Sequence, residues 1–225
     1  MSVKDKLAAV RERMEAAQAR AGRRDGVTLI GATKGAAVPV LEEALEAGLD
    51  CFGENRMQEA LPKIEALAGR GVSWHFIGHL QKNKAPAAAR HFAMVQSVDS
   101  PGLALKLQGA AREMEMTLPV LVEINIGGEP AKTGCVPADL PALLDALARC
   151  ENLVFEGLMA VPPYHPDPER IRPHFRQMRE IFDRLAGVFP RVRHLSMGMS
   201  EDFEAAIEEG ATMVRLGRAL FGERA

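Results

Sequence analysis

Two groups of residues, far apart in the sequence, could together bind a reactive phosphorylated ligand. Lys34 follows a nearly apolar run at residues 27–33, so its primary amine should lie at the exit of a buried strand. Residues 195–200 (Leu-Ser-Met-Gly-Met-Ser) and 213–218 (Met-Val-Arg-Leu-Gly-Arg) supply hydroxyls, backbone N–H groups and cations, which are the groups that bind phosphate. An amine beside such a phosphate site predicts a phosphorylated aldehyde held as a Schiff base.

Each of these residues also has an ordinary interpretation. A lysine such as Lys34 is most often a solvated loop residue, although a partly desolvated position would favour the neutral amine that attacks aldehydes. Ser200 could simply cap the acidic helix expected at residues 201–209, whose N-terminus could also bind an anion. Glu201 and Asp202 would then have to point away from a phosphate.

The last predicted strand carries the remaining candidates. Gly217 allows close approach of the backbone, and its N–H and that of Arg218 are available to a phosphate. Arg215 lies in an otherwise apolar strand, where a buried cation needs a partner. That partner is either a carboxylate such as Glu123 or a ring nitrogen of the ligand.

Alternating strands and helices must position these groups. Strands are predicted at residues 27–33, 50–53, 73–77, 92–97, 118–125, 153–160, 192–196 and 211–216. Helices are predicted at residues 3–21, 38–48, 58–67, after Gln81, and at 101–115, 139–149, 171–185 and 201–209, the first with a Ser2–Asp5 capping box. Eight alternating units predict a single-domain TIM (β/α)8 barrel over residues 1–225, with a doubly wound open sheet as the alternative.

A barrel places functional groups at the carboxyl ends of its strands. The groups expected there are Lys34, Glu54, Asn55, His79, Asp99, Asn125, Met159, Ser196, Ser200, Arg215 and Gly217. The turn-rich segment at residues 162–168 is expected to be a loop between a strand and a helix rather than a domain boundary.

Composition narrows the class of protein. The chain has 225 residues and a formal net charge of −2, which disfavours a nucleic-acid-binding function. No segment is apolar enough to span a bilayer and no signal peptide is evident, so a cytoplasmic monomer without membrane contact is expected. Three cysteines without C-x-x-C spacing, and His75 and His79 on a strand exit rather than a helix, predict neither a disulfide framework nor a metal site.

Motifs in order along nearly the whole chain resemble the pyridoxal phosphate homeostasis protein family. The segments that carry the resemblance are 32–34 (Ala-Thr-Lys), 52–55 (Phe-Gly-Glu-Asn) with Gln58 and Glu59, 74–84, 98–100, 123–125, 157–159, 195–200 and 214–217. The resemblance implies a barrel like the N-terminal domain of alanine racemase and pyridoxal 5'-phosphate (PLP) as the cofactor.

The resemblance also implies a role for each site residue. Lys34 would form an aldimine with PLP, and Ser200, with Ser196 nearby and the backbone of Gly217 and Arg218, would hold the phosphate. Arg215 would face the pyridine nitrogen, and Asn55 would lie near the ring. The chain departs from the family pattern at residues 35–37 and at Arg218, and neither departure removes a group that the chemistry requires.

Binding is expected rather than turnover, so no catalytic residue is assigned. A racemase of this fold needs a second base, a tyrosine from a C-terminal domain that this chain is not expected to contain, and its one tyrosine, Tyr164, lies in the Pro-rich loop. A role in vitamin B6 homeostasis and amino/keto-acid balance is therefore expected, with PLP-dependent apo-enzymes as potential acceptors. The alternatives are a minimal PLP-dependent racemase or a Schiff-base aldolase, while a regulatory RNA-binding module lacks the basic patch it would need.

Overall fold

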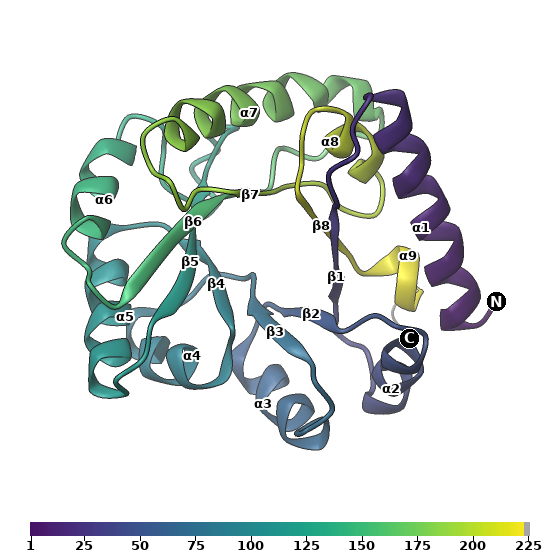
Figure 1. The fold of residues 1–225 in the computed structure, drawn as a ribbon, viewed down its shortest axis with the longest axis horizontal. Helices are drawn as coiled ribbons and strands as arrows, with labels where there is room; N and C mark the ends of the chain where they lie inside the picture. The colour runs from purple at the N-terminus through teal and green to yellow at the C-terminus, as the bar shows by residue number, and fades with distance from the viewer. Residues whose placement is uncertain (223–225) are drawn as a thin grey trace.

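Eight parallel strands close into a barrel in a computed structural model that describes residues 1–222 (Figure 1). The strands are β1 (Thr28–Ala32), β2 (Cys51–Glu54), β3 (Ser73–Phe76), β4 (Met94–Val98), β5 (Leu118–Ile124), β6 (Leu153–Ala160), β7 (His194–Ser196) and β8 (Met213–Leu216). The helices are α1 (Val3–Arg20), α2 (Val38–Glu46), α3 (Met57–Ala66), α4 (Ala85–His91), α5 (Pro101–Glu113), α6 (Leu140–Leu147), α7 (Arg172–Ala186), α8 (Phe203–Glu208) and α9 (Arg218–Phe221). Two short 3-10 helices, η1 (Lys82–Lys84) and η2 (Pro168–Arg170), precede α4 and α7.

Closure of the sheet decides between the two predicted architectures. β8 pairs with β1 in parallel, with Leu29 opposite Val214 and Gly31 opposite Leu216. An open doubly wound sheet would leave these strands at separate edges, so the barrel prediction is confirmed and the open-sheet alternative is wrong.

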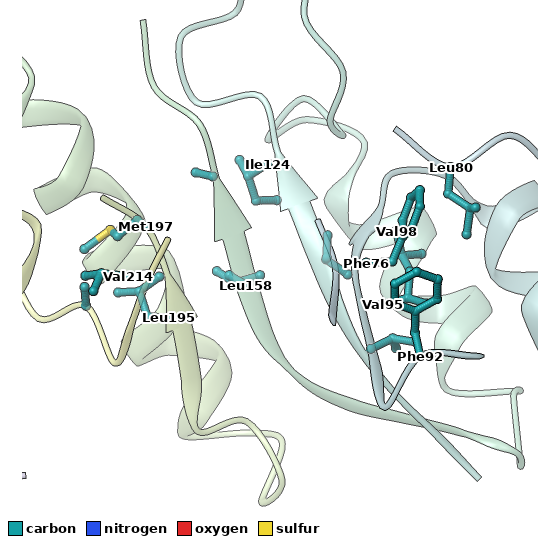
Figure 2. Packing of buried hydrophobic residues seen from close by; sticks show 14 of the residues in the cluster. Phe76, Leu80, Phe92, Val95, Val98, Ile124, Leu158, Leu195, Met197 and Val214 are labelled. Atoms are coloured by element: carbon teal, nitrogen blue, oxygen red, sulfur yellow. The ribbon is translucent and has the colours of Figure 1, made fainter. Parts of the chain in front are cut away.

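Alternation along the strands produces two packed layers. Outward-facing residues such as Leu158, Leu195 and Val214 pack beneath the surrounding helices (Figure 2). Inward-facing residues form a smaller apolar cluster inside the barrel, comprising Ile30, Cys51, Met94, Leu121, Met159 and Met213. The strands are therefore buried on both faces, which explains their nearly continuous apolar sequences.

Helix boundaries follow local signals with two exceptions. Ser2 and Asp5 form the predicted capping box at the start of α1. The helix after β7 differs, because α8 begins at Phe203 with Asp202 at its N-cap position, so Ser200 does not cap this helix. The four-residue helix α9 was not predicted, since one helical turn carries no periodic pattern.

Two further expectations concern the chain as a whole. No helix within residues 1–222 is both long and apolar enough to cross a membrane. The prediction that one domain extends through residue 225 includes residues 223–225, which lie outside the described residues, and it stays a prediction.

Barrel closure at the β6–β7 junction should tolerate no side chain at Gly157. This residue has φ +149°, and a Cβ built on it would lie 1.8 Å from the carbonyl oxygen of His194. We expect Gly157→Ala to destabilise the protein by more than about 4 kcal/mol or to prevent folding. Gly109→Ala on α5 is the matched control, since a Cβ there meets nothing within 4 Å, and it should stabilise the helix by up to about 1 kcal/mol. Equal urea midpoints for the two variants would contradict the assignment of strain to Gly157.

Candidate functional site

A cavity of about 230 Å³ opens at the carboxyl ends of the strands. Six of the seven residues predicted to bind a cofactor line it, namely Lys34, Asn55, Ser200, Arg215, Gly217 and Arg218. They come from the ends of β1, β2, β7 and β8, so the closed barrel brings together groups separated by up to 184 positions, from Lys34 to Arg218. Ser196, the seventh, is not among the lining residues.

Buried contacts behind β1 fix the backbone from which Lys34 projects. Thr33 donates its N–H to the carbonyl of Gly53 at 2.9 Å, and its own carbonyl accepts a hydrogen bond from Lys63 Nζ at 2.7 Å. The Lys34 side chain itself is exposed. This differs from the partly desolvated position considered from the sequence, since Lys34 lies in the turn after β1 at the open side of the cavity.

Glu54 lies at the carboxyl end of β2, as expected, but its side chain points outward from the barrel. Its side chain is fully buried between the barrel and α3, where Oε1 accepts hydrogen bonds from Lys63 Nζ at 2.6 Å and from Thr33 Oγ1 at 2.5 Å. Glu54 shares the outward face with Phe52, whereas Cys51 faces inward. Glu54 therefore supports the turn that carries Lys34 and does not line the cavity.

The predicted phosphate-binding residues lie where the β7–α8 loop meets α9. Ser200 Oγ accepts a hydrogen bond from the backbone N–H of Ala219 at 3.2 Å. Gly217 approaches the end of β1 closely, since a Cβ there would lie 3.2 Å from the carbonyl oxygen of Ala32. The serine hydroxyl and the first turn of α9 thus lie against each other at the edge of the cavity.

The two acidic residues after Ser200 both have partners within the protein. The Glu201 carboxylate pairs with Arg218 at 2.6 Å in an exposed contact. Asp202 Oδ1 accepts the N–H of Met199 at 2.6 Å, and burial raises the pKa of this carboxyl group. The charge of Arg218 is therefore shared with Glu201.

Arg215 is held inside the barrel by neutral groups. Its Nη1 donates to Ser196 Oγ at 2.6 Å and its Nη2 to the carbonyl of Ala160 at 2.9 Å. The ion pair with Glu123 is not formed: Glu123 Oε1 accepts a hydrogen bond from Thr133 Oγ1 at 2.8 Å, and Glu123 acts on Arg215 only through longer-range charge. Burial lowers the pKa of the Arg215 guanidinium to about 10, which leaves it protonated at neutral pH.

Comparisons with known proteins agree with this geometry. Residues 6–225 match the profile of the alanine racemase N-terminal domain. The pyridoxal phosphate homeostasis protein of Aquifex aeolicus is 43% identical over 226 residues, covering 100% of this chain and 99% of that protein. The protein of the same name from Pseudomonas aeruginosa is 42% identical, covering 99% and 96%.

This chain belongs to the pyridoxal phosphate homeostasis protein family. Among solved structures, PipY of Synechococcus elongatus with PLP bound is 34% identical with a TM-score of 0.87, covering 98% of this chain and 100% of PipY. An alanine racemase of Clostridium difficile has a TM-score of 0.73 at 18% identity and shows the shared fold alone, with 60% of its length covered. The resemblance noted in the sequence is confirmed.

Other residues at this family member's cavity were not predicted to contribute. Tyr164 and His165 from the loop after β6, together with Ile171, Phe221 and Gly222, also line it. Tyr164 is 70% exposed, so it forms part of the rim. No periodic signal marks these residues, because they come from an irregular loop and a single helical turn.

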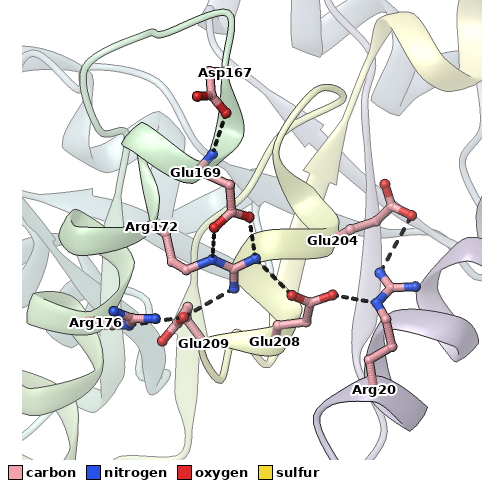
Figure 3. A network of polar contacts seen from close by, with 8 residues as sticks. All are labelled: Arg20, Asp167, Glu169, Arg172, Arg176, Glu204, Glu208 and Glu209. Carbon is pink, nitrogen blue, oxygen red and sulfur yellow. Dashed lines mark hydrogen bonds and ion pairs between the residues drawn. The ribbon is translucent and has the colours of Figure 1, made fainter.

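A polar network anchors the end of the loop after β6 (Figure 3), whose residues Tyr164 and His165 line the cavity. Arg172 at the start of α7 pairs with Glu169 at 2.6 Å, Glu208 at 2.9 Å and Glu209 at 3.1 Å. Glu208 also pairs with Arg20 of α1 at 2.6 Å. The end of the loop is thereby fixed to α8 and α1, and the exposure of several partners limits the free energy that the network contributes.

The remaining groups predicted at the barrel mouth have separate roles. His79 and Asp99 lie 3.6 Å apart in a neighbouring depression. Asn125 bonds the carbonyl of Glu129 at 2.9 Å and so shapes its own loop. Met159 belongs to the apolar cluster inside the barrel.

His75 should make stability depend on pH in a definite window. Burial is the main cause that lowers the pKa of this barrel-interior histidine from 6.5 to about 4, with a smaller contribution from His194. Between about pH 6.5 and pH 4 the unfolded chain therefore binds a proton that the folded protein does not, so stability falls as the pH is lowered. The loss should reach about 3 kcal/mol, because each pKa unit corresponds to about 1.4 kcal/mol.

Urea unfolding of the wild type and of His75→Gln across this range measures the effect. The variant lacks the titrating group, so its free energy of unfolding should fall less on acidification, while every other group, His194 included, is common to both proteins. Parallel curves for the two proteins would contradict the low pKa of His75.

Proposed function

We propose that this protein binds PLP covalently through Lys34 and serves to hold the cofactor rather than to turn over a substrate. The observation that carries the proposal is the convergence of one amine, one serine hydroxyl, a glycine-containing backbone turn and a buried guanidinium on a single cavity. An amine close to an anion site at the last two strands of a barrel is the combination that a phosphorylated aldehyde such as PLP requires.

The groups present fit PLP. The cavity is smaller than a site for a drug-sized molecule, which suits a ligand with one ring and one phosphate. Ser200 and the backbone of Gly217 and Arg218 would hold the phosphate, Asn55 would lie beside the ring, and Lys34 would bond the aldehyde carbon. At Gly217 a Cβ would lie 3.2 Å from the carbonyl oxygen of Ala32, so a side chain there would crowd the end of β1.

Arg215 gives the reason for expecting little turnover. When bound, PLP supplies an electrophilic carbonyl and a ring that accepts electrons best when its nitrogen is protonated. Arg215 lines the cavity and keeps its own proton at neutral pH, so as a donor to the ring nitrogen it would not transfer that proton. The ring would then withdraw electrons weakly, which disfavours carbanion chemistry.

The exposure of Lys34 supports a carrier role. Its amine is reached by solvent, so water and small amines can also reach the atom bonded to it. A site of this kind favours exchange of the cofactor, including transfer to PLP-dependent apo-enzymes. The names of the relatives, which refer to PLP homeostasis, and the PLP bound in PipY support the same conclusion.

Racemisation is the second candidate function, and Tyr164 is the observation that favours it. A racemase places one base on each face of the substrate carbon, and a phenol at the rim of a cavity that contains Lys34 could serve as the second base. Tyr164 is 70% exposed, and among the described residues no hydrogen bond fixes its hydroxyl. This lack of positioning makes it a poor catalyst.

Lys34→Ala should abolish covalent attachment of PLP. Apo-protein incubated with PLP should develop a visible absorption band, and borohydride reduction followed by peptide mapping should place the label on Lys34. The variant should lose the band while retaining weaker binding through the phosphate contacts. Lys106→Ala, an exposed lysine on the outer face of α5, is the control and should behave as the wild type does. A band that survives in Lys34→Ala would refute the assignment.

A turnover assay separates the two candidate functions. PLP-loaded protein incubated with L-alanine or L-serine should leave the enantiomeric composition unchanged over many enzyme equivalents, because the second base is not positioned. Tyr164→Phe is the informative variant. Rapid racemisation that requires both Lys34 and the Tyr164 hydroxyl would overturn the carrier function in favour of the racemase.

A further inference from the structure

A continuous line of hydrogen bonds crosses the barrel interior beneath the cavity. Arg215 Nη1 donates to Ser196 Oγ at 2.6 Å, and Ser196 Oγ donates to Gln96 Oε1 at 2.7 Å. Gln96 Nε2 lies 2.9 Å from His75 Nδ1, and His75 Nε2 lies 3.3 Å from Ser73 Oγ. The line runs from β8 and β7 across to β4 and β3 and ends near the amino-terminal end of the barrel.

Chemistry fixes the direction of every bond in this line. The guanidinium can only donate, so Ser196 accepts from Arg215 and has one proton left for Gln96. Gln96 then presents its oxygen to Ser196 and its NH2 to His75, which requires Nδ1 to be an unprotonated acceptor and places the proton on Nε2. A flipped amide would leave the Ser196 proton without an acceptor among the described residues.

The surroundings of His75 agree with this neutral tautomer. Burial lowers its pKa to about 4, and the nearest titratable groups are Cys51, with Sγ 3.7 Å from Nε2, and the neighbouring His194. Burial also raises the pKa of the Cys51 thiol to about 12. The pKa of His194 is itself lowered, mainly by burial. Within residues 1–222, burial and His194 are the causes that act on His75, and both disfavour its protonation.

We propose that Gln96 and His75 are positioning residues for Arg215, acting through Ser196 to aim its guanidinium at the bound cofactor. The inference rests on the proposed PLP-binding function and adds two residues that do not touch the cavity. Arg215 has five N–H donors, of which the bonds to Ser196 and Ala160 use two, and the side chain reaches the cavity with the remainder. Without Ser196 and Gln96 the head group would be held only by the Ala160 carbonyl.

An electrostatic requirement explains why the line of hydrogen bonds extends beyond Ser196 to Gln96 and His75. A guanidinium enclosed by the barrel needs partners, yet a carboxylate in contact would compete with the ligand for its donors. Neutral acceptors that are themselves polarised by the next hydrogen bond stabilise the cation and leave its free donors available. Gln96 provides this polarisation by accepting the proton of Ser196, and His75 adds to it by accepting from Gln96.

Affinity measurements on apo-protein titrated with PLP test the proposal. Gln96→Met keeps the shape of the side chain but removes both hydrogen bonds, and Ser196→Ala removes the next link. Each should weaken PLP binding about tenfold, the size expected for loss of one buried hydrogen bond to a charged group. The double variant should bind no more weakly than about the weaker single variant, because both changes break one line.

Met94→Leu is the matched control, since Met94 lies one inward position before Gln96 on β4 and belongs to the apolar cluster of the barrel interior. It should bind PLP as the wild type does. Gln96→Glu should remain within about threefold of the wild type, because its carboxylate still accepts from Ser196. If Gln96→Met does not fold, Ser196→Ala and Gln96→Glu carry the test.

Nitrogen NMR of the apo-protein gives a readout that is independent of PLP. In the wild type, His75 should show an unprotonated Nδ1 and a protonated Nε2. In Gln96→Glu, Nδ1 should become protonated, because a carboxylate cannot donate to it. This change of tautomer tests the direction of the bond between Gln96 and His75, and the PLP affinities test whether that bond positions Arg215.

Two results would overturn the inference. One is a protonated Nδ1 in the wild type, which reverses the direction of the line. The other is PLP affinity in Gln96→Met and Ser196→Ala equal to that of Met94→Leu. Failure of the proposed function is a different result, in which the wild type itself acquires no borohydride-stable label on Lys34.

Discussion

The burial of the Arg215 guanidinium is the constraint on which the interior of this barrel depends. Its side chain is 4% exposed and carries a full charge, so it must be satisfied by hydrogen bonds or be lost as a cation. The barrel meets this requirement with Ser196 and a backbone carbonyl rather than with a carboxylate in contact. An interior that would otherwise be filled by apolar side chains therefore contains a polar line, and apolar residues such as Met213 pack around it.

Contacts outside the barrel wall perform the complementary task of fixing the loops. Glu54, Lys63 and Thr33 form a buried polar cluster between β1, β2 and α3, directly behind the turn that bears Lys34. On the other side, the ion pairs of Arg172 tie the end of the loop after β6 to α8. The cavity thus has a rigid floor inside the barrel and loops that are held from outside, an arrangement that lets an exposed amine keep a defined position.

The sequence was sufficient for the architecture and for bringing six of the seven predicted cofactor-binding residues to one cavity. Eight alternating units imply parallel strands, and their carboxyl ends must meet at one edge, which is why Lys34, Ser200 and Gly217 could be placed together without coordinates. Side-chain direction was harder to predict. Strands of four residues such as β2 give too short an alternation to decide the face, so the sequence did not show that the Glu54 side chain points away from the cavity.

Longer-range partners could not be predicted for a different reason. Gln96 and Ser196 are 100 positions apart, and nothing local in either strand indicates that their side chains meet across the barrel axis. Ser200 was expected to cap a helix because serine before acidic residues usually does, yet Asp202 occupies that position and Ser200 contacts α9 instead. Tertiary packing overrode the local preference in each case.

The combination of an exposed lysine and a buried arginine defines what the site can do. A covalent bond to Lys34 would be accessible to solvent and therefore reversible on exposure to other amines, which weakens retention. Retention must then come from the phosphate contacts and from Arg215, whose position does not depend on the loops. Lys34 would therefore form the bond that exchanges, while the phosphate contacts and Arg215 would provide the affinity. It suits a protein that keeps a reactive aldehyde sequestered and releases it on demand, and it suits poorly an enzyme that must exclude water from its reacting atoms.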